Sequence, residues 1–171
     1  PHIVLIFLCT RLLGLYVRLP NETAMEPTLT PFTPVWVSKS PSSLVAGTLV
    51  WMTDPLDEEN TLIRRLIALP GQTISVRDHV IRINKKSLYL VDMDVDKSLQ
   101  FRLFEERDRG ARINPHTIRH RTDTKPWSAP DLEVPIDHIY VLCDDRDRCL
   151  DSRWWGPIPV EFVRGIVRPI F

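Results

Sequence analysis

The sequence predicts a mostly β domain. Short runs rich in β-branched and aromatic residues recur along the chain with period-two alternation, and turn residues separate them. The chain has 15 prolines against 6 glycines, which favours extended segments and edge strands over long helices. Its 171 residues suit one domain, or one domain with an insertion.

The first element is an apolar run at residues 3–9, interrupted by Thr10 and Arg11. A spanning helix needs about 20 apolar residues, so this run is too short to cross a bilayer alone. We expect residues 1–11 to be the end of an N-terminal membrane anchor. The alternative is the first buried strand or helix of a soluble domain.

The strands follow in order, each recognised by alternation or by β-branched and aromatic content. They are expected at residues 12–19, 35–37, 49–52, 61–69, 74–76, 80–83 and 162–170, and residues 134–142 are expected to form a turn that leads into a strand. The pair 74–76 and 80–83 alternates around a short polar turn and predicts a hairpin. Between residues 84 and 133 the pattern weakens, and the charged stretch 98–110 is compatible with a short helix or an exposed arm.

Composition excludes some functions. The chain is 43% hydrophobic and 26% charged, as in an ordinary globular protein. Its 22 basic and 22 acidic side chains give a formal net charge of zero. Phosphate binding normally needs a concentrated basic surface, so we expect no nucleic-acid partner.

Two residue pairs raise the possibility of a crosslink or a metal. Cys143 and Cys149 are near enough in sequence to close a small loop, but proximity does not supply the geometry of a disulfide. His116 and His120 are four residues apart, yet no helical pattern holds them and no third ligand is in register. We expect no metal and no cofactor, and we expect a solvated loop or subunit contact around the two histidines.

Three motifs carry a family resemblance. Residues 24–29, Ala-Met-Glu-Pro-Thr-Leu, resemble the nucleophile box of type I signal peptidases, which are membrane-bound serine–lysine proteases. Residues 62–71 resemble the lysine box of that family, a strand ahead of a Leu-Pro-Gly turn. Residues 143–156 resemble its C-terminal signature. The three motifs keep the internal spacing and the order found in the family.

The resemblance implies a fold. We expect the signal-peptidase-like β catalytic domain, with a core formed by residues 12–83 and 134–171. Residues 84–133 lie outside all three motifs and are expected to form a variable second lobe or insertion.

The catalytic positions of the family are altered in this chain. The resemblance places Ala24 at the nucleophilic serine, Arg64 at the general-base lysine and Cys149 at the serine that orients the lysine. An alanine has no nucleophilic atom, and a guanidinium stays protonated in proteins and so cannot act as a base. One extra residue before Ala24 places Glu22 where the family often has a small oxyanion-stabilising residue, and a carboxylate there would repel developing negative charge.

The resemblance also implies binding and supporting residues. Small apolar pockets beside the nucleophile would be lined by Val17, Leu19, Met25, Leu62 and Ile63. Plain hydrophobic core is the alternative, because strand patterning produces the same residues. Structural support for the site is expected from Asp145, Arg146, Asp151, Ser152 and Arg153, with a charge pair between Asp151 and Arg153; ordinary surface charges are the alternative.

The sequence therefore leads to a functional hypothesis with rivals. We expect a membrane-anchored, catalytically inactive signal-peptidase homologue with its domain on the extracytoplasmic face. Its partners would be extended signal-peptide-like or pilin-like polypeptides, or an active secretion or pilus-assembly protein that it scaffolds. The first rival is a genuine signal peptidase whose nucleophilic serine is replaced by Ala24. The second is an interaction module that no longer binds peptides.

Overall fold

The computed structural model describes residues 15–18, 22–38, 44–93, 100–108 and 113–170. The expected anchor, residues 1–11, and Leu19 lie outside this part of the chain. No helix within the described ranges has the length and apolar character that a membrane span requires.

The largest element is a seven-stranded sheet with the order β1-β2-β14-β3-β4-β12-β13. Its strands are β1 (Leu15–Arg18), β2 (Val35–Ser38), β3 (Leu49–Asp54), β4 (Asp57–Ala68), β12 (His138–Leu142), β13 (Ile158–Pro159) and β14 (Val163–Pro169). All of its described pairings are antiparallel. Two short helices, α2 (Ser152–Trp155) and η1 (Val160–Phe162), lie between β12 and β14 in sequence. The expected mostly β fold is confirmed.

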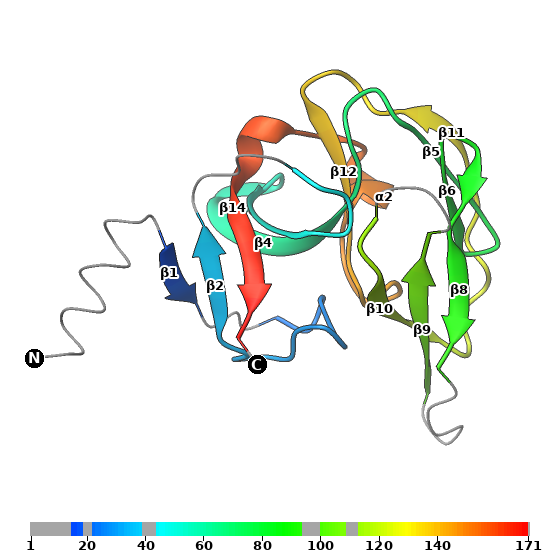
Figure 1. Cartoon of the computed structure of the whole chain (residues 1–171), viewed down its shortest axis with the longest axis horizontal. Helices are drawn as coiled ribbons and strands as arrows, with labels where there is room; N and C mark the ends of the chain where they lie inside the picture. Colours follow the sequence, from blue (N-terminus) through cyan, green and yellow to red (C-terminus); the bar gives the residue numbers. More distant parts are fainter. Residues whose placement is uncertain (1–14, 19–21, 39–43, 94–99, 109–112, 171) are drawn as a thin grey trace, which may run out of the picture.

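Two smaller sheets complete the described structure, on the side of the molecule opposite β1 (Figure 1). One has the order β11-β5-β6-β7, from Ala129–Glu133, Thr73–Arg77, Val80–Ile83 and Lys86–Ser87. The other has the order β10-β9-β8, from His116–Arg121, Phe101–Arg107 and Tyr89–Asp92. The expected hairpin at 74–83 is confirmed as β5 and β6, and their sheet draws strands from both sides of the boundary expected after residue 83.

Two expectations for the middle of the chain are wrong. The charged stretch 98–110 is neither a helix nor an exposed arm within its described part, because residues 101–107 form β9 between β8 and β10. His116 and His120 are not in a solvated loop: both lie on β10, where they are buried. On a strand, residues four apart share a face, and that face of β10 is the buried one. His116 Nε2 lies 3.0 Å from a Glu106 oxygen on β9, and His120 Nδ1 lies 3.4 Å from an Asp147 oxygen.

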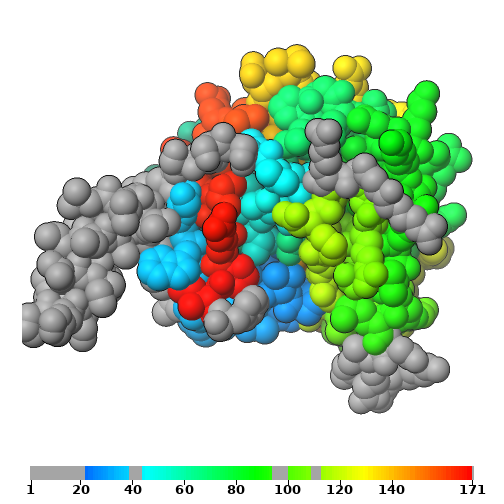
Figure 2. Space-filling model, in the orientation of Figure 1, coloured from blue at the N-terminus to red at the C-terminus, as the bar shows by residue number. Residues whose placement is uncertain are grey.

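The C-terminal strand β14 lies between β2 and β3 and is visible on the face of the molecule shown in Figure 2. Gly165 allows this close approach, since a Cβ at that position would come within 2.6 Å of the Ser38 carbonyl oxygen. One hydrophobic cluster beneath this part of the sheet joins Ala24, Met25 and Val167. The turn that carries Ala24 is therefore fixed to the sheet by core packing.

Candidate functional site

Ala24 lies in a turn that lines a cavity of about 470 Å³. The Ala24 side chain is buried, and its carbonyl oxygen accepts a hydrogen bond of 3.0 Å from the Asp145 N–H. Arg64, Cys149 and Glu22 line the same cavity. The structure thus brings together the positions that the sequence assigned to nucleophile, base, lysine orientation and oxyanion.

The most prominent feature of the cavity is an ion pair between Glu22 and Arg64. Arg64 Nη1 donates to Glu22 Oε2 over 2.9 Å, and the Ile63 N–H donates to Glu22 Oε1, also over 2.9 Å. Arg64 also donates through Nε to the Leu150 carbonyl and through Nη1 to the Ile63 carbonyl. The Arg64 side chain is only 5% exposed, against 26% for Glu22. A guanidinium stays protonated in proteins, so Arg64 cannot accept a proton as a general base.

The strand edge beside the cavity is open. β4 pairs with β3 through residues 57–65, but β12 pairs with the other edge of β4 only from Arg65 onward. Among the described strands none pairs with that other edge over residues 57–63. A strand edge of this kind presents backbone donors and acceptors to an added chain.

The expected pocket residues occupy different surroundings. Leu62 lines the cavity, whereas Met25 and Ile63 are buried in the adjoining hydrophobic cluster. Val17 lies on β1, and Leu19 lies outside the described residues. Leu56, Leu150 and Trp155, which the sequence reasoning did not propose, complete the apolar lining together with Pro31.

A disulfide joins Cys143 to Cys149, with 6.4 Å between their Cα atoms. Cys149 therefore has no free thiol with which to orient a neighbouring side chain. The two sulfurs and a carboxylate oxygen of Asp151 lie within 4.8 Å of one another, a spacing that a metal ion can use, but the disulfide engages both sulfurs. The bridge closes the loop that follows β12.

Asp151 and Arg153 stabilise the segment after this loop. Arg153 donates to both carboxylate oxygens of Asp151 over 2.8 Å, and the Asp151 side chain also caps α2 by accepting from the Arg153 N–H. Ser152 Oγ accepts from the Val141 N–H over 3.0 Å. These residues thus hold α2 against β12, and Asp151 is fully buried.

The loop residues 144–147 connect the site to the smaller sheets through ion pairs. Asp145 pairs with Arg119 on β10 at 2.5 Å, and Arg146 pairs with Glu106 on β9 at 2.8 Å. Arg119 pairs in addition with Glu26 in the turn that carries Ala24. Two neighbouring residues of this loop therefore link the candidate site to β9 and β10.

Two buried titratable side chains on the β10-β9-β8 sheet, Glu106 and His120, have strongly shifted pKa values. Burial alone would raise the pKa of Glu106, but Arg146 and His116 outweigh it and hold this pKa at about 2. Burial is the main reason that the pKa of His120 falls to about 4, with Arg146 and His79 acting in the same direction. His120 is therefore neutral near pH 7, while Glu106 is ionised.

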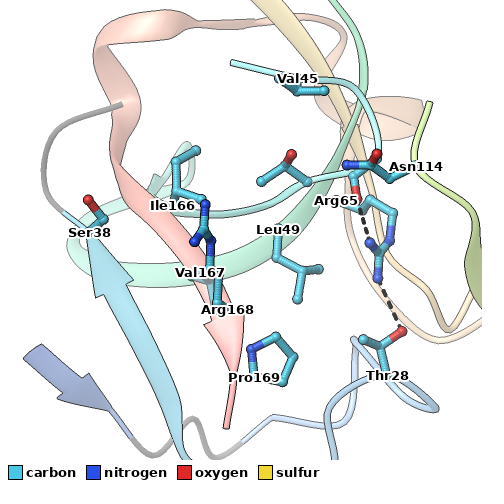
Figure 3. A pocket seen from close by; sticks show the side chains of 12 residues that line it. Thr28, Ser38, Val45, Leu49, Arg65, Asn114, Ile166, Val167, Arg168 and Pro169 are labelled. Carbon is cyan, nitrogen blue, oxygen red and sulfur yellow. Dashed lines mark hydrogen bonds between the residues drawn. The ribbon is translucent and has the colours of Figure 1, made fainter. Parts of the chain in front are cut away.

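Arg65 points away from Arg64, because successive residues of a strand face opposite sides of the sheet. Arg65 donates through Nε and Nη2 to Asp144 over 2.7 and 2.5 Å, through Nη1 to the Gly47 carbonyl, and through Nη2 to Thr28 Oγ1. It lines a second cavity of about 480 Å³ beside β14, and Figure 3 shows its side chain directed toward Thr28. The two adjacent arginines therefore have separate partners and separate roles.

Sequence reasoning did not assign roles to Arg65, Asp144, Glu106 or Arg119. One signal was available, since two arginines inside an otherwise apolar strand need acidic partners once that strand is buried. In the structure Glu22 supplies the partner of Arg64, and Asp144 supplies the partner of Arg65. The pairing itself depends on three-dimensional contacts that no motif records.

Comparison with known proteins gives a consistent result. The sequence profile described as signal peptidase, peptidase S26, matches residues 2–171. Signal peptidase I of Aquifex aeolicus is 23% identical over 181 residues, which cover 84% of this chain and 70% of that protein. Signal peptidase I V of Bacillus subtilis is 26% identical over 111 residues, which cover 64% of this chain and 57% of that protein.

Two further proteins are also similar to this chain. Thylakoidal processing peptidase 1 of Arabidopsis thaliana is 24% identical over 106 residues, covering 62% of this chain and 23% of that protein. A crystal structure of a signal peptidase I from Enterococcus faecalis superposes with a TM-score of 0.49 at 24% identity, covering 75% of this chain and 100% of that chain.

Proposed function

This chain belongs to the signal peptidase S26 family, and we propose that within this family it binds extended, signal-peptide-like segments of other polypeptides without cleaving them. The proposal rests chiefly on the Glu22–Arg64 ion pair, which fills the place where a serine–lysine protease needs a neutral amine. Ala24 supplies no hydroxyl at the other catalytic position.

The groove supports a binding role. The open edge of β4 over residues 57–63 offers the main-chain groups that an extended peptide uses when it joins a sheet. Leu56, Leu62 and Leu150 line the cavity beside that edge. A peptide lying there would place its apolar side chains in the cavity and its backbone against β4.

The wider setting is part of the proposal. We place the domain on the extracytoplasmic face of a membrane, held by an N-terminal anchor whose end is residues 1–11. The polypeptides bound there would be signal-peptide-like or pilin-like, and an active secretion or pilus-assembly protein would be scaffolded by the same surface.

Peptide binding and cleavage are measured together to test the proposal. A synthetic signal-peptide-like peptide should quench or shift tryptophan fluorescence, since Trp155 lines the cavity, and mass spectrometry should find the peptide intact. Leu62→Asp should weaken binding at least tenfold, about 1.4 kcal/mol. Leu132→Asp, at a 40% exposed leucine of β11, is the matched control and should bind normally. Cleavage after a small-x-small motif by the unaltered protein would refute the proposal.

The rival in which Ala24 alone disables a genuine peptidase is tested by restoration. Ala24→Ser should remain inactive, because Arg64 leaves the new hydroxyl without a base. Recovery of specific cleavage by Ala24→Ser alone would favour the genuine peptidase over the binding protein.

A further inference from the structure

The Glu22 carboxylate is held by two donors at the end of the open strand edge. One is Arg64 Nη1 and the other is the Ile63 N–H, each 2.9 Å from a different oxygen. The Ile63 N–H belongs to the backbone of β4, so the carboxylate occupies a place that the main chain of an added peptide would otherwise use. We call these two donors, Arg64 Nη1 and the Ile63 N–H, the carboxylate clamp, and Glu22 is its ligand from within the chain.

We propose that this clamp binds the free C-terminal carboxylate of an extended peptide, and that Glu22 is its displaceable occupant. The inference rests on the proposed function and specifies it, because it names the chemical class of the bound segment. The ligand would be a peptide that ends at the cavity, as a proteolytic product does, rather than an uninterrupted polypeptide passing through it.

The geometry of β4 favours a chain end over an internal segment. The edge is open along residues 57–63, and β12 occupies it from Arg65 onward. A strand added along the open part therefore meets β12 immediately beyond the clamp. A peptide terminus fits a strand slot that is closed at one end, whereas an internal segment would have to turn away from the sheet.

Arg64 is prepared to bind a carboxylate. Its Nε and Nη1 are fixed by the carbonyl oxygens of Leu150 and Ile63, which hold the guanidinium plane in place. Within the described residues its Nη2 donates to no group, so a donor remains for a second carboxylate oxygen. Arginine recognises carboxylates through two such parallel hydrogen bonds.

Charge and exposure allow Glu22 to be displaced. Its side chain is 26% exposed while that of Arg64 is 5% exposed, so Glu22 can rotate into solvent and Arg64 cannot. The charged residues lining the cavity are Glu22, Asp54, Arg64 and Arg148. With Glu22 rotated out, two arginines face one aspartate, and the lining then carries an excess positive charge that an incoming carboxylate neutralises.

The experiment compares three peptides of the same signal-peptide-like sequence by isothermal titration calorimetry. One ends in a free carboxylate, one in an amide, and one in an amide with a glutamate as its last residue. The free acid should bind at least tenfold more tightly than the plain amide. Equal affinity of acid and amide would overturn the inference while leaving the proposed function intact, and absence of binding by all three would count against the proposed function itself.

The third peptide and four variants test which carboxylate is recognised and whether Arg64 recognises it. If the glutamate amide binds as tightly as the acid, the site reads any carboxylate and the assignment to a chain end is wrong. Glu22→Gln should raise the affinity for the acid severalfold by removing the competitor. Arg64→Gln and Arg64→Lys should both reduce the tenfold preference, and its survival in either variant would overturn the role of Arg64. Arg168→Gln, at an exposed arginine of β14, should leave the preference unchanged.

Discussion

Removing either partner of the Glu22–Arg64 pair should destabilise the fold, and the two losses should not add. Taking one partner from a buried ion pair typically costs about 3–5 kcal/mol. Arg64 keeps two carbonyl acceptors and Glu22 is 26% exposed, so water relieves part of this cost. We expect Glu22→Gln to cost about 2 kcal/mol, because the guanidinium stays buried.

Arg64→Met should cost less, about 1.5 kcal/mol, because Glu22 keeps the Ile63 N–H and can reach water. The double variant should cost about 2 kcal/mol rather than the sum of about 3.5, which corresponds to a coupling of about 1.5 kcal/mol. Urea unfolding followed by tryptophan fluorescence gives each free energy of unfolding. The pair Arg121–Asp123, in which the Asp123 side chain is 63% exposed, is the more exposed control and should show a much smaller coupling.

A coupling below about 0.5 kcal/mol would refute this reasoning, since additivity within that limit is the behaviour of independent sites. It would mean that Arg64 is satisfied by the carbonyls of Ile63 and Leu150 alone. Glu22 would then be an incidental neighbour of Arg64, and the carboxylate clamp would lose its structural basis.

Three further outcomes follow from the structure. Because the pKa of Glu106 is about 2 in the folded chain against an ordinary 4.5, the contribution of Glu106 to stability should be complete above pH 4.5 and be lost as pH drops toward 2. The pKa of His120 is about 4 against an ordinary 6.5, so a separate loss of stability is expected as pH falls from 6.5 to 4. Urea titrations across pH test both, and Glu106→Gln should flatten the lower limb. The Cys143–Cys149 bridge has a sequence separation of 6, and closing this loop limits the entropy of the unfolded chain, so reducing the bridge should cost about 2 kcal/mol. Urea unfolding with and without dithiothreitol in a Cys9→Ser background measures this cost. An unchanged unfolding midpoint would contradict the expected stabilisation. Gly165→Ala should lower the free energy of unfolding by about 1–3 kcal/mol, because the new methyl group meets the Ser38 carbonyl, and a neutral effect would show that β2 can shift.

The fold and the meeting of Ala24, Arg64 and Cys149 could be predicted because they depend on local motifs. Strand alternation sets which residues face the core, and the order of the three motifs fixes their place in a known β fold. Cavity lining by all three residues agrees with that reasoning. The sequence alone is sufficient to predict features that depend on residue spacing within one strand or one turn.

The smaller sheets could not be predicted in the same way. β9 carries charged residues on both faces, and β10 carries arginines on one face and histidines on the other. Glu106 is fully buried, with Arg146, 40 residues away, and His116 as its partners. No periodic hydrophobic pattern marks such a strand. The disulfide could not be predicted from sequence either, because the 6.4 Å between the Cα atoms of Cys143 and Cys149 is set by the folded loop.

Glu22, Ala24 and Arg64 line one cavity and form one interdependent set. An arginine in place of a lysine adds a permanent charge that burial penalises unless a carboxylate lies beside it. Glu22 is that carboxylate, and it would oppose an oxyanion at the same place. Ala24 leaves the neighbouring position without a nucleophile. Under the proposed function, Ala24→Ser alone would place a hydroxyl beside an ion pair that neither accepts its proton nor stabilises an oxyanion. We therefore expect cleavage to require Ala24→Ser, Arg64→Lys and removal of the Glu22 charge together.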